Sequence, residues 1–388
     1  MMNINLNENH EELRSRVREI CKKYPDEYWQ ELDENREYPS AFVDELSTSG
    51  LLSVLIPKEY GGEGRTLTEA TVVMEEIQAN GCNGGVCHAQ MYIMGTLLKH
   101  GNEEQKNRFL TKIASGELRL QVFGVTEKHT GSDTTKLRTF AEKVDGGYLV
   151  NGHKFYIGRG QYSDLMLLLA RTTPQDEVKK KVDGLSTFIV DMRKEKGKSL
   201  DIKPIRTMMN HSLTEIYIKD LFIPEENLVG ELGKGFRYIL DGMNAERLLI
   251  ASECVGDAKW FIERSTDWAN RRELFGRPIG KNQGIQFPIA RAYASMLAAE
   301  MMVKKGCAVF EAGENCGEEA NTALLLASEA SWEAANVAMQ TYGGRGFDAN
   351  FAIERKFRET RLYQVAPISK NLILAYLSEH VLGLPRSY

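Results

Sequence analysis

The sequence predicts a multidomain α+β protein with an α-helical N-terminal domain, a central antiparallel β domain and a C-terminal four-helix bundle. The period of the hydrophobic residues is helical up to about Arg119, becomes strand-like there, and is helical again after Gly235. A chain of 388 residues is long enough for two or three domains. We therefore expect domains at residues 1–119, 120–230 and 231–388.

In the first block, apolar residues recur three and four positions apart, as on the buried face of a helix. A turn-rich stretch, Pro57 to Gly64, separates two of the expected helices. The helices are expected at Glu11 to Cys21, Ser40 to Ser49, Leu67 to Ile77 and Glu103 to Ser115.

The middle block contains short β-branched or aromatic runs that predict strands. The turns Val144-Asp-Gly-Gly and Val150-Asn-Gly have the chemistry of tight reversals between antiparallel strands. The runs are Leu120 to Phe123, Gly147 to Asn151, Asp164 to Ala170, Ser186 to Val190, Leu200 to Ile205 and Glu215 to Ile218.

The last block predicts four long helices with short connections, which favours an antiparallel bundle. Phe236 to Ile250 marks the first, and residues 285–310, 318–341 and 365–382 mark the others.

Composition excludes several classes of protein. Lys and Arg number 49 and Asp and Glu 54, for a net charge of −5, without the basic stripe of a nucleic-acid binder. The apolar runs are too short for a membrane span, and the polar segment Met1 to His10 does not resemble a signal peptide. Six scattered cysteines, with no further ligands to join Cys82, Cys87 and His88, indicate a cytoplasmic protein without a metal site.

Two segments of the β block offer polar or backbone groups to a ligand. Val125 to Asp133 carries hydroxyls and free backbone N–H groups that suit a phosphate or a heterocycle edge, although the same residues suit an ordinary Asx-type turn. Asn151 to Gln161 has an aromatic residue and close glycines that allow a backbone to approach a flat ligand, or simply a kinked strand.

Two segments of the helical bundle have the same ambiguity. In Asn270 to Gln283, arginines around Phe275 could pair with a pyrophosphate and stack an adenine, or form a salt-bridged surface. In Gln340 to Phe347, three glycines follow a helix, which also fits a C-cap.

Together these segments resemble the acyl-CoA dehydrogenase family over essentially the whole chain. The Thr-Glu-x-x-x-Gly-Ser-Asp segment of the family is Thr126 to Asp133. Its Arg-x-x-Phe-Gly with a downstream Gln is Arg272 to Gly276 with Gln283, and its Gln-x-x-Gly-Gly-x-Gly is Gln340 to Gly346.

The resemblance implies an FAD site shared between two subunits of a homotetramer, with acyl-CoA as substrate and an electron-transfer flavoprotein as electron acceptor. Ser132, Asn244 and Arg247 would contact the substrate. The residues implied in FAD binding are Phe123, Val125, Thr126, Ser132, Tyr156, Ile157, Gly158, Arg272, Phe275, Gln283, Gln340, Gly343, Gly344 and Ser369.

The sequence departs from the family pattern where most members carry the catalytic carboxylate. Pro367 occupies that position, in Tyr363 to Ser369, and proline has neither a proton acceptor nor a backbone N–H. A minority, similar to the isovaleryl-CoA and long-chain enzymes, place the glutamate on the first bundle helix, which here is Glu246. We expect Glu246 to be the base, with a pKa raised toward neutrality by an apolar acyl pocket.

A second departure is Gly158, where relatives usually have a hydroxyl residue near flavin N5. The prediction is therefore FAD-dependent α,β-dehydrogenation of an acyl-CoA thioester. The alternatives are a flavin monooxygenase or oxidase of the same fold, a dehydrogenase of carrier-protein thioesters, and a flavoprotein without catalytic activity. The sequence does not indicate the length or branching of the acyl chain.

Overall fold

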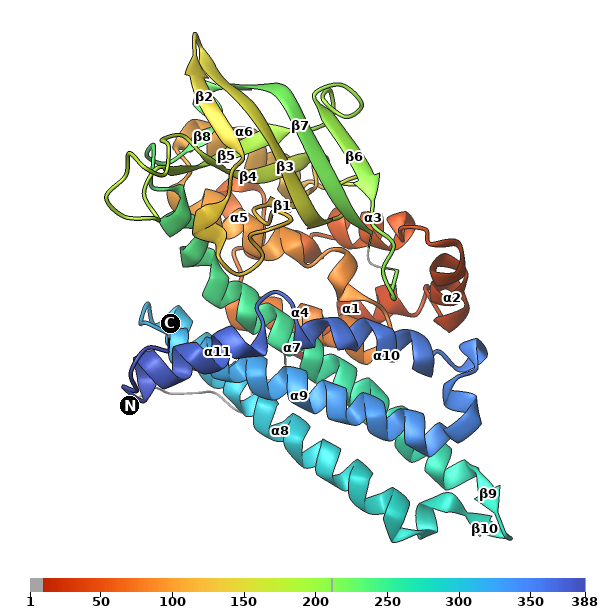
Figure 1. Ribbon diagram of the computed structural model, residues 1–388. Helices are drawn as coiled ribbons and strands as arrows, with labels where there is room; N and C mark the ends of the chain where they lie inside the picture. The colour runs from red at the N-terminus through yellow and green to blue at the C-terminus, as the bar shows by residue number, and fades with distance from the viewer. Residues whose placement is uncertain (1–9, 211, 388) are drawn as a thin grey trace. The chain divides into compact units, whose positions relative to one another are not determined.

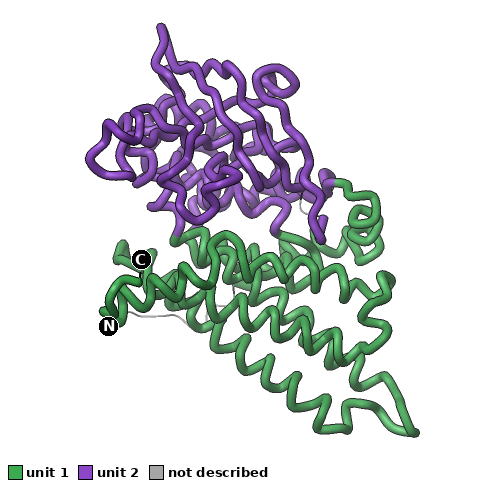
Figure 2. Tube along the Cα trace, in the orientation of Figure 1, with its two compact units in different colours: residues 1–37, 66–84, 244–388 green, residues 38–65, 85–243 purple. Residues whose placement is uncertain are grey.

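The computed structural model describes residues 10–210 and 212–387, so the predicted polar opening of the chain lies outside the described residues except for His10. The chain forms two compact units, which Figure 2 shows in two colours. Unit 1 contains residues 1–37, 66–84 and 244–388, and unit 2 contains residues 38–65 and 85–243.

Unit 2 is built on an eight-stranded sheet in the order β6-β7-β3-β2-β4-β5-β8, with β1 paired to β4 (Figure 1). The sheet is chiefly antiparallel, but β1 runs parallel to β4, and β2 makes one parallel pairing with β4. The strands are β1 (Leu120–Gly124), β2 (Phe140–Val144), β3 (Gly147–Gly158), β4 (Leu165–Arg171), β5 (Leu185–Asp191), β6 (Leu200–Pro204), β7 (Leu213–Pro224) and β8 (Leu228–Val229).

Helices α3 (Ser40–Thr48), α5 (Ala89–His100) and α6 (Glu103–Ala114) also belong to unit 2. Helix α5 packs on β1, and α6 packs on α5. The core of the sheet is apolar and includes Val122, Val150, Met166 and Ile216, all buried. This core fixes β1 and β3, the two strands that lead into the predicted ligand-binding segments.

The predicted reversal at Val150-Asn-Gly is wrong, because Asn151 and Gly152 lie inside β3. The register between β3 and β7 shifts at this point, and the Asn151 amide exchanges hydrogen bonds with Asp220 of β7. A Cβ at Gly152 would overlap the Thr139 side chain, so this glycine allows close packing. The reversal predicted after Val144 is present, with β2 and β3 joined by a two-residue turn.

Unit 1 is helical, and its core is a bundle in which α8 packs along α9 and α10 and α11 pack on α9 (Figure 1). Its helices are α1 (Glu11–Cys21), α2 (Asp26–Asn35), α4 (Leu67–Ala79), α7 (Gly235–Arg271), α8 (Gln283–Glu311), α9 (Gly317–Tyr342), α10 (Ile353–Arg361) and α11 (Lys370–Tyr376). Only the part of α7 from Asn244 onward belongs to unit 1. The unit also contains a short hairpin of β9 (Glu273–Leu274) and β10 (Arg277–Pro278).

The predicted helix at 365–382 is wrong at its start, because residues 365–369 are irregular and α11 begins at Lys370. The Ser369 hydroxyl caps α11 by accepting the Leu372 N–H. Helices α2, α5 and α10 and strands β2 and β8 were not expected. The order of helices, sheet and helices is confirmed, while the domain boundaries at residues 119 and 230 stay a prediction.

Candidate functional site

In unit 2, the predicted ligand loop leaves β1 directly after Gly124, and hydrogen bonds tie it to β3. We call residues 125–133 the Val125 loop. The Thr126 carbonyl accepts the Phe155 N–H at 2.9 Å. The structure thereby brings Val125 and Thr126 beside the end of β3, where Tyr156, Ile157 and Gly158 lie.

A β-bulge shapes this end of β3. Lys154 pairs with Ile216 and Ile157 with Thr214, so three steps along β3 oppose two along β7. Tyr156 has φ 57° and is 59% exposed, which is uncommon for a large residue and typical of functional positions. The Ile157 side chain is buried in the sheet core, so only its backbone can meet a ligand.

The space around the bulge and the loop suits a flat ligand. A Cβ added at Gly158 or Gly131 would meet nothing within 4 Å. Ser132 is exposed, and the Phe123 ring is half-buried. Within the described part of the chain, the buried Thr130 hydroxyl has no hydrogen-bond partner. An unpaired buried hydroxyl in an open loop fits a site for a polar heterocycle such as FAD.

An ion pair that the sequence analysis missed lies behind the loop. Lys154 on β3 is fully buried, and its Nζ lies 3.1 Å from Glu127 Oε1 and 3.0 Å from the Val125 carbonyl. Burial lowers the pKa of Lys154 to about 8, against the opposing effect of Glu127. Burial alone would raise the pKa of Glu127, but Lys154 and hydrogen bonds from Thr139 and Arg138 keep it below its usual value. The sequence contains no clear signal for this pair, because Lys154 follows the polar residues Asn151 and His153 in β3.

In unit 1, Glu246 lies near the start of the unit's segment of α7 and is 5% exposed. Asn244 and Arg247, the predicted substrate contacts, are on the same helix, and Arg247 Nη1 donates to Asn244 Oδ1 at 3.0 Å. Arg247 Nε is buried without an acceptor among the described residues. Burial lowers the pKa of Arg247, and the charge of Glu246 opposes this. This stretch of α7 therefore holds a buried carboxylate and a guanidinium with one unused donor.

The segment Tyr363 to Ser369, where the resemblance to the family places the catalytic carboxylate of most members, contains no carboxylate. Pro367 is exposed in an irregular stretch, and the Ser369 oxygen is engaged as a helix cap. Tyr363 before it is buried, and its hydroxyl donates to Glu253 at 2.7 Å while accepting from Gln78 at 3.1 Å. These bonds anchor the segment to α7 and α4.

The predicted adenosine-binding residues lie at one end of the bundle in unit 1. Trp268 near the end of α7 stacks on Tyr342 at the end of α9, with ring centroids 4.8 Å apart. Phe275 is at the turn of the β9–β10 hairpin with φ 52° and is 104% exposed. All six predicted residues at this end of the bundle are exposed. They are Arg272, Phe275, Gln283, Gln340, Gly343 and Gly344.

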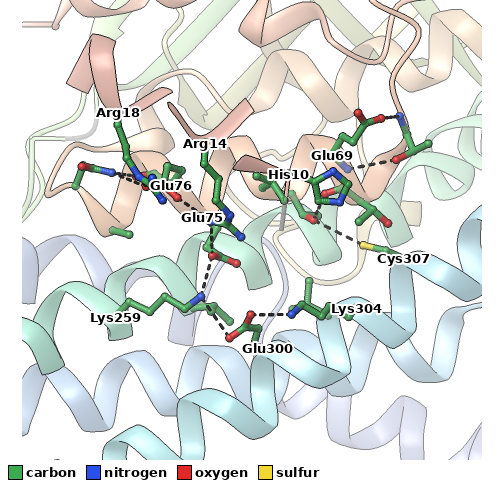
Figure 3. Close-up of a pocket in the computed structure, with 18 of the residues that line it drawn as sticks. His10, Arg14, Arg18, Glu69, Glu75, Glu76, Lys259, Glu300, Lys304 and Cys307 are labelled. Atoms are coloured by element: carbon green, nitrogen blue, oxygen red, sulfur yellow. Dashed lines mark hydrogen bonds and ion pairs between the residues drawn. The ribbon is translucent and has the colours of Figure 1, made fainter. Parts of the chain in front are cut away.

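A charged cleft of about 800 Å³ lies elsewhere in unit 1 and contains none of the predicted site residues (Figure 3). It is lined by α1, α4, α7 and α8. Lys259 pairs with Glu75 at 2.8 Å and with Glu300 at 3.3 Å, and Arg14 bridges Glu75 and Glu76. Because these side chains are already paired with one another, we interpret the cleft as a structural ion-pair network. No helix of the described residues is long and apolar enough to span a membrane, and no described His, Cys, Asp or Glu residues group into a metal site.

Comparison with known proteins identifies the class of enzyme. The models of the acyl-CoA dehydrogenase N-terminal, middle and C-terminal domains match residues 7–117, 122–221 and 233–367. An acyl-CoA dehydrogenase of Bacillus subtilis (strain 168) is 32% identical over 374 residues, which cover 96% of this chain and 97% of the relative. The chain is therefore an oxidoreductase that belongs to the acyl-CoA dehydrogenase family.

Solved structures agree with this assignment. The glutaryl-coenzyme A dehydrogenase–glutaryl-CoA complex matches with a TM-score of 0.91 and 26% identity, covering 100% of this chain and 98% of that one. A structure described as the electron transferring flavoprotein of Acidaminococcus fermentans matches with a TM-score of 0.89 and 26% identity, covering 98% and 100%. The prediction of the family and its fold is confirmed.

Proposed function

We propose that this enzyme is an FAD-dependent dehydrogenase that converts an acyl-CoA thioester to the 2-enoyl-CoA. Glu246 removes the proton from the α-carbon, and the hydride leaves from the β-carbon. Bound FAD supplies the hydride acceptor. A base for this step must be a carboxylate within hydrogen-bond reach of the α-proton.

The observation that carries the proposal is the buried carboxylate of Glu246 beside Arg247, together with the missing carboxylate in Tyr363–Ser369. A carboxylate that is taken from water holds its proton more tightly, which suits a group that accepts a proton and later releases it. Arg247 and Asn244 orient the substrate through their polar groups, including the unused Arg247 Nε donor.

Two parts of the chain are proposed to hold FAD. Phe123, Val125, Thr126 and the bulge at Tyr156–Gly158 would meet the flavin, and Ser132 and the unpaired Thr130 hydroxyl would meet its polar neighbours. Arg272, Phe275, Gln283, Gln340, Gly343, Gly344 and Ser369 complete the predicted set. Apart from Ser369, these residues are exposed in a single chain, Phe275 above all, which supports their binding to the FAD of a second copy in a homotetramer.

Pro367 supplies no backbone N–H to the thioester oxygen. Loss of one such donor costs about 10²–10³ in rate when nothing replaces it. Of the neighbouring donors that the sequence offers, the Ala366 N–H already donates to the Leu362 carbonyl at 3.0 Å, so Ile368 would have to donate instead. We further propose an electron-transfer flavoprotein as acceptor, in line with the matched structure from Acidaminococcus fermentans.

Anaerobic bleaching of bound FAD by a panel of acyl-CoAs, measured in a stopped-flow instrument, tests the function. Glu246→Gln keeps the size of the side chain, so it is expected to retain FAD and acyl-CoA binding but to bleach several orders of magnitude more slowly. Glu263→Gln, an exposed glutamate on the same helix, is the matched control and should bleach at the wild-type rate.

Bleaching of Glu246→Gln within tenfold of the wild type would place the base elsewhere. The same bleaching measurement with acyl thioesters of a carrier protein tests the alternative that the substrate is bound to a protein and not to CoA. Rapid oxidation by air of flavin that has been reduced with dithionite, with no thioester present, would favour the oxidase alternative.

A further inference from the structure

Lys154 is the charged side chain directly behind the Val125 loop of unit 2. It is 0% exposed, and its ammonium donates to the Val125 carbonyl at 3.0 Å and to Glu127 Oε1 at 3.1 Å. Burial of a cation costs several kcal/mol unless partners satisfy it. Both partners of Lys154 belong to the loop, so the position of the loop and that of the ammonium depend on each other.

Glu127 has a fixed place, because three further hydrogen bonds hold its carboxylate. Oε1 accepts the Thr139 N–H at 2.9 Å and the Thr139 hydroxyl at 2.6 Å, and Oε2 accepts the Arg138 N–H at 2.7 Å. Since the carboxylate cannot move freely, the ammonium between it and the Val125 carbonyl is fixed as well.

The geometry of the Val125–Thr126 peptide links Lys154 to the opposite side of the loop. A trans peptide is planar, and its N–H points away from its C=O. Because the Val125 carbonyl faces Lys154, the Thr126 N–H faces away from it. That N–H has no acceptor among the described residues. A cation on the carbonyl polarises the peptide and strengthens its N–H as a donor.

We propose that Lys154 is a positioning residue that polarises the Val125–Thr126 peptide, so that the Thr126 N–H binds the flavin more strongly in its reduced, negatively charged form. This inference rests on the proposed function, because it requires FAD at the Val125 loop. Lys154 does not touch the flavin and acts through the peptide alone.

Two variants separate this role from loop anchoring. Lys154→Met should weaken the binding of oxidised FAD about tenfold. It should weaken the binding of reduced FAD about tenfold more than that, because the hydrogen bond from the Thr126 N–H is charge-assisted only when the flavin is negatively charged. A tenfold difference between the two states lowers the two-electron potential by about 30 mV. Glu127→Gln should also weaken FAD binding, but it should raise the potential because the ammonium loses its counter-charge.

The measurements are FAD affinity, by fluorescence quenching with the apoprotein, and the flavin potential, by dye equilibration. Shifts of potential in the same direction in both variants, or none in Lys154→Met, would overturn the proposal. Where Lys154→Met does not fold, the double variant with Glu127→Gln replaces the ion pair by a neutral pair and should fold. Its potential should lie below that of Glu127→Gln, and an equal potential overturns the proposal.

Lys356→Met is the matched control. Lys356 is a buried lysine of unit 1 whose Nζ lies 2.5 Å from the buried Asp257. This variant should lose stability but keep the wild-type flavin potential, and a shifted potential would show that loss of any buried lysine has the effect. Failure of the wild-type apoprotein to bind FAD would refute the proposed function itself. Normal FAD binding together with an unchanged flavin potential in the variants would refute only the role of Lys154.

Discussion

Glu246 and Glu253 lie seven residues apart on α7 and therefore project from the same side of the helix. Both are buried, at 5% and 0% exposure. Glu253 accepts the hydrogen bond of the Tyr363 hydroxyl, which anchors the segment that contains Pro367. Glu246 neighbours Arg247 instead, whose Nε is unused within the described part of the chain. The bond from Tyr363 gives Glu253 a structural role, and Glu246 stays the carboxylate that we propose as the base.

The buried Lys154 also predicts a dependence of stability on pH. Its folded pKa is about 8, because burial outweighs the attraction of Glu127, while an unfolded lysine titrates near 10.4. Between these values the unfolded chain binds the proton that the folded chain has lost, so the contribution of this group to stability rises with pH. From pH 8 to pH 10 the gain is on the order of 2 kcal/mol.

Urea unfolding of the apoprotein at pH 8 and pH 10 measures this effect as the difference between the wild type and Lys154→Met, which cancels the titration of other groups. The other charged residues near this site are Glu127, which faces Lys154, and Arg171, which faces Glu127. A difference that is constant with pH would mean that Lys154 keeps an ordinary pKa.

Strand β3 carries most of the proposed flavin environment because it departs twice from a regular register with β7. The shift near Gly152 adjusts the middle of the strand, and the bulge at Tyr156 turns that side chain outward. Gly152 also makes room for Thr139, which holds Glu127. The packing of one glycine is thus connected to the ion pair behind the Val125 loop.

Gly152→Ala is therefore expected to be destabilising, because its methyl group would overlap Thr139. Overpacking of this kind costs about 1–3 kcal/mol, which should appear as a lower melting temperature of the apoprotein and weaker FAD retention. Gly158→Ala on the same strand is the control, since its Cβ meets open space, and its apoprotein should melt as the wild type does. Equal melting temperatures of the two variants would contradict this account of Gly152.

The single chain leaves large apolar side chains in solvent along α8 and on the adjoining hairpin. They are Leu274, Phe275, Phe287, Tyr293, Leu297 and Met301. Tyr293, Leu297 and Met301 are four residues apart and therefore share one face of α8, and an exposed apolar face usually marks an interface. The surface supports the predicted assembly of several copies.

Arg272→Ala and Phe275→Ala are expected to weaken FAD retention and assembly together, because both residues are proposed to reach the cofactor of a second copy. Light scattering coupled to gel filtration gives the mass, and the absorbance ratio of flavin to protein gives the FAD content. Arg193→Ala removes an exposed arginine of unit 2 that pairs with Asp191, and it should affect neither. A monomeric variant that retains all of its FAD would contradict a shared site.

The sequence by itself determined the features that depend on local order. The bounds of α1 agree with the predicted helix at both ends, and α8 and α9 agree within two residues. Their apolar residues recur at helical spacing, so periodicity suffices to find them. Motifs at fixed spacing, such as Thr126 to Asp133, were enough to identify the family. The absence of a carboxylate between Tyr363 and Ser369 was also visible from the sequence.

Only the tertiary structure decided the features that depend on distant partners. Helix α5 is buried almost throughout, so it lacks the apolar stripe of a surface helix. Helix α10 buries Arg355, Lys356 and Glu359 in ion pairs, so its buried face is largely charged. Asn151-Gly152 has the composition of a turn but pairs inside a sheet. Lys154 and Glu127 are 27 residues apart, and nothing in their local sequence requires them to meet. The physical reason is that burial and pairing between distant segments override local preference, and this positions the ion pair behind the Val125 loop.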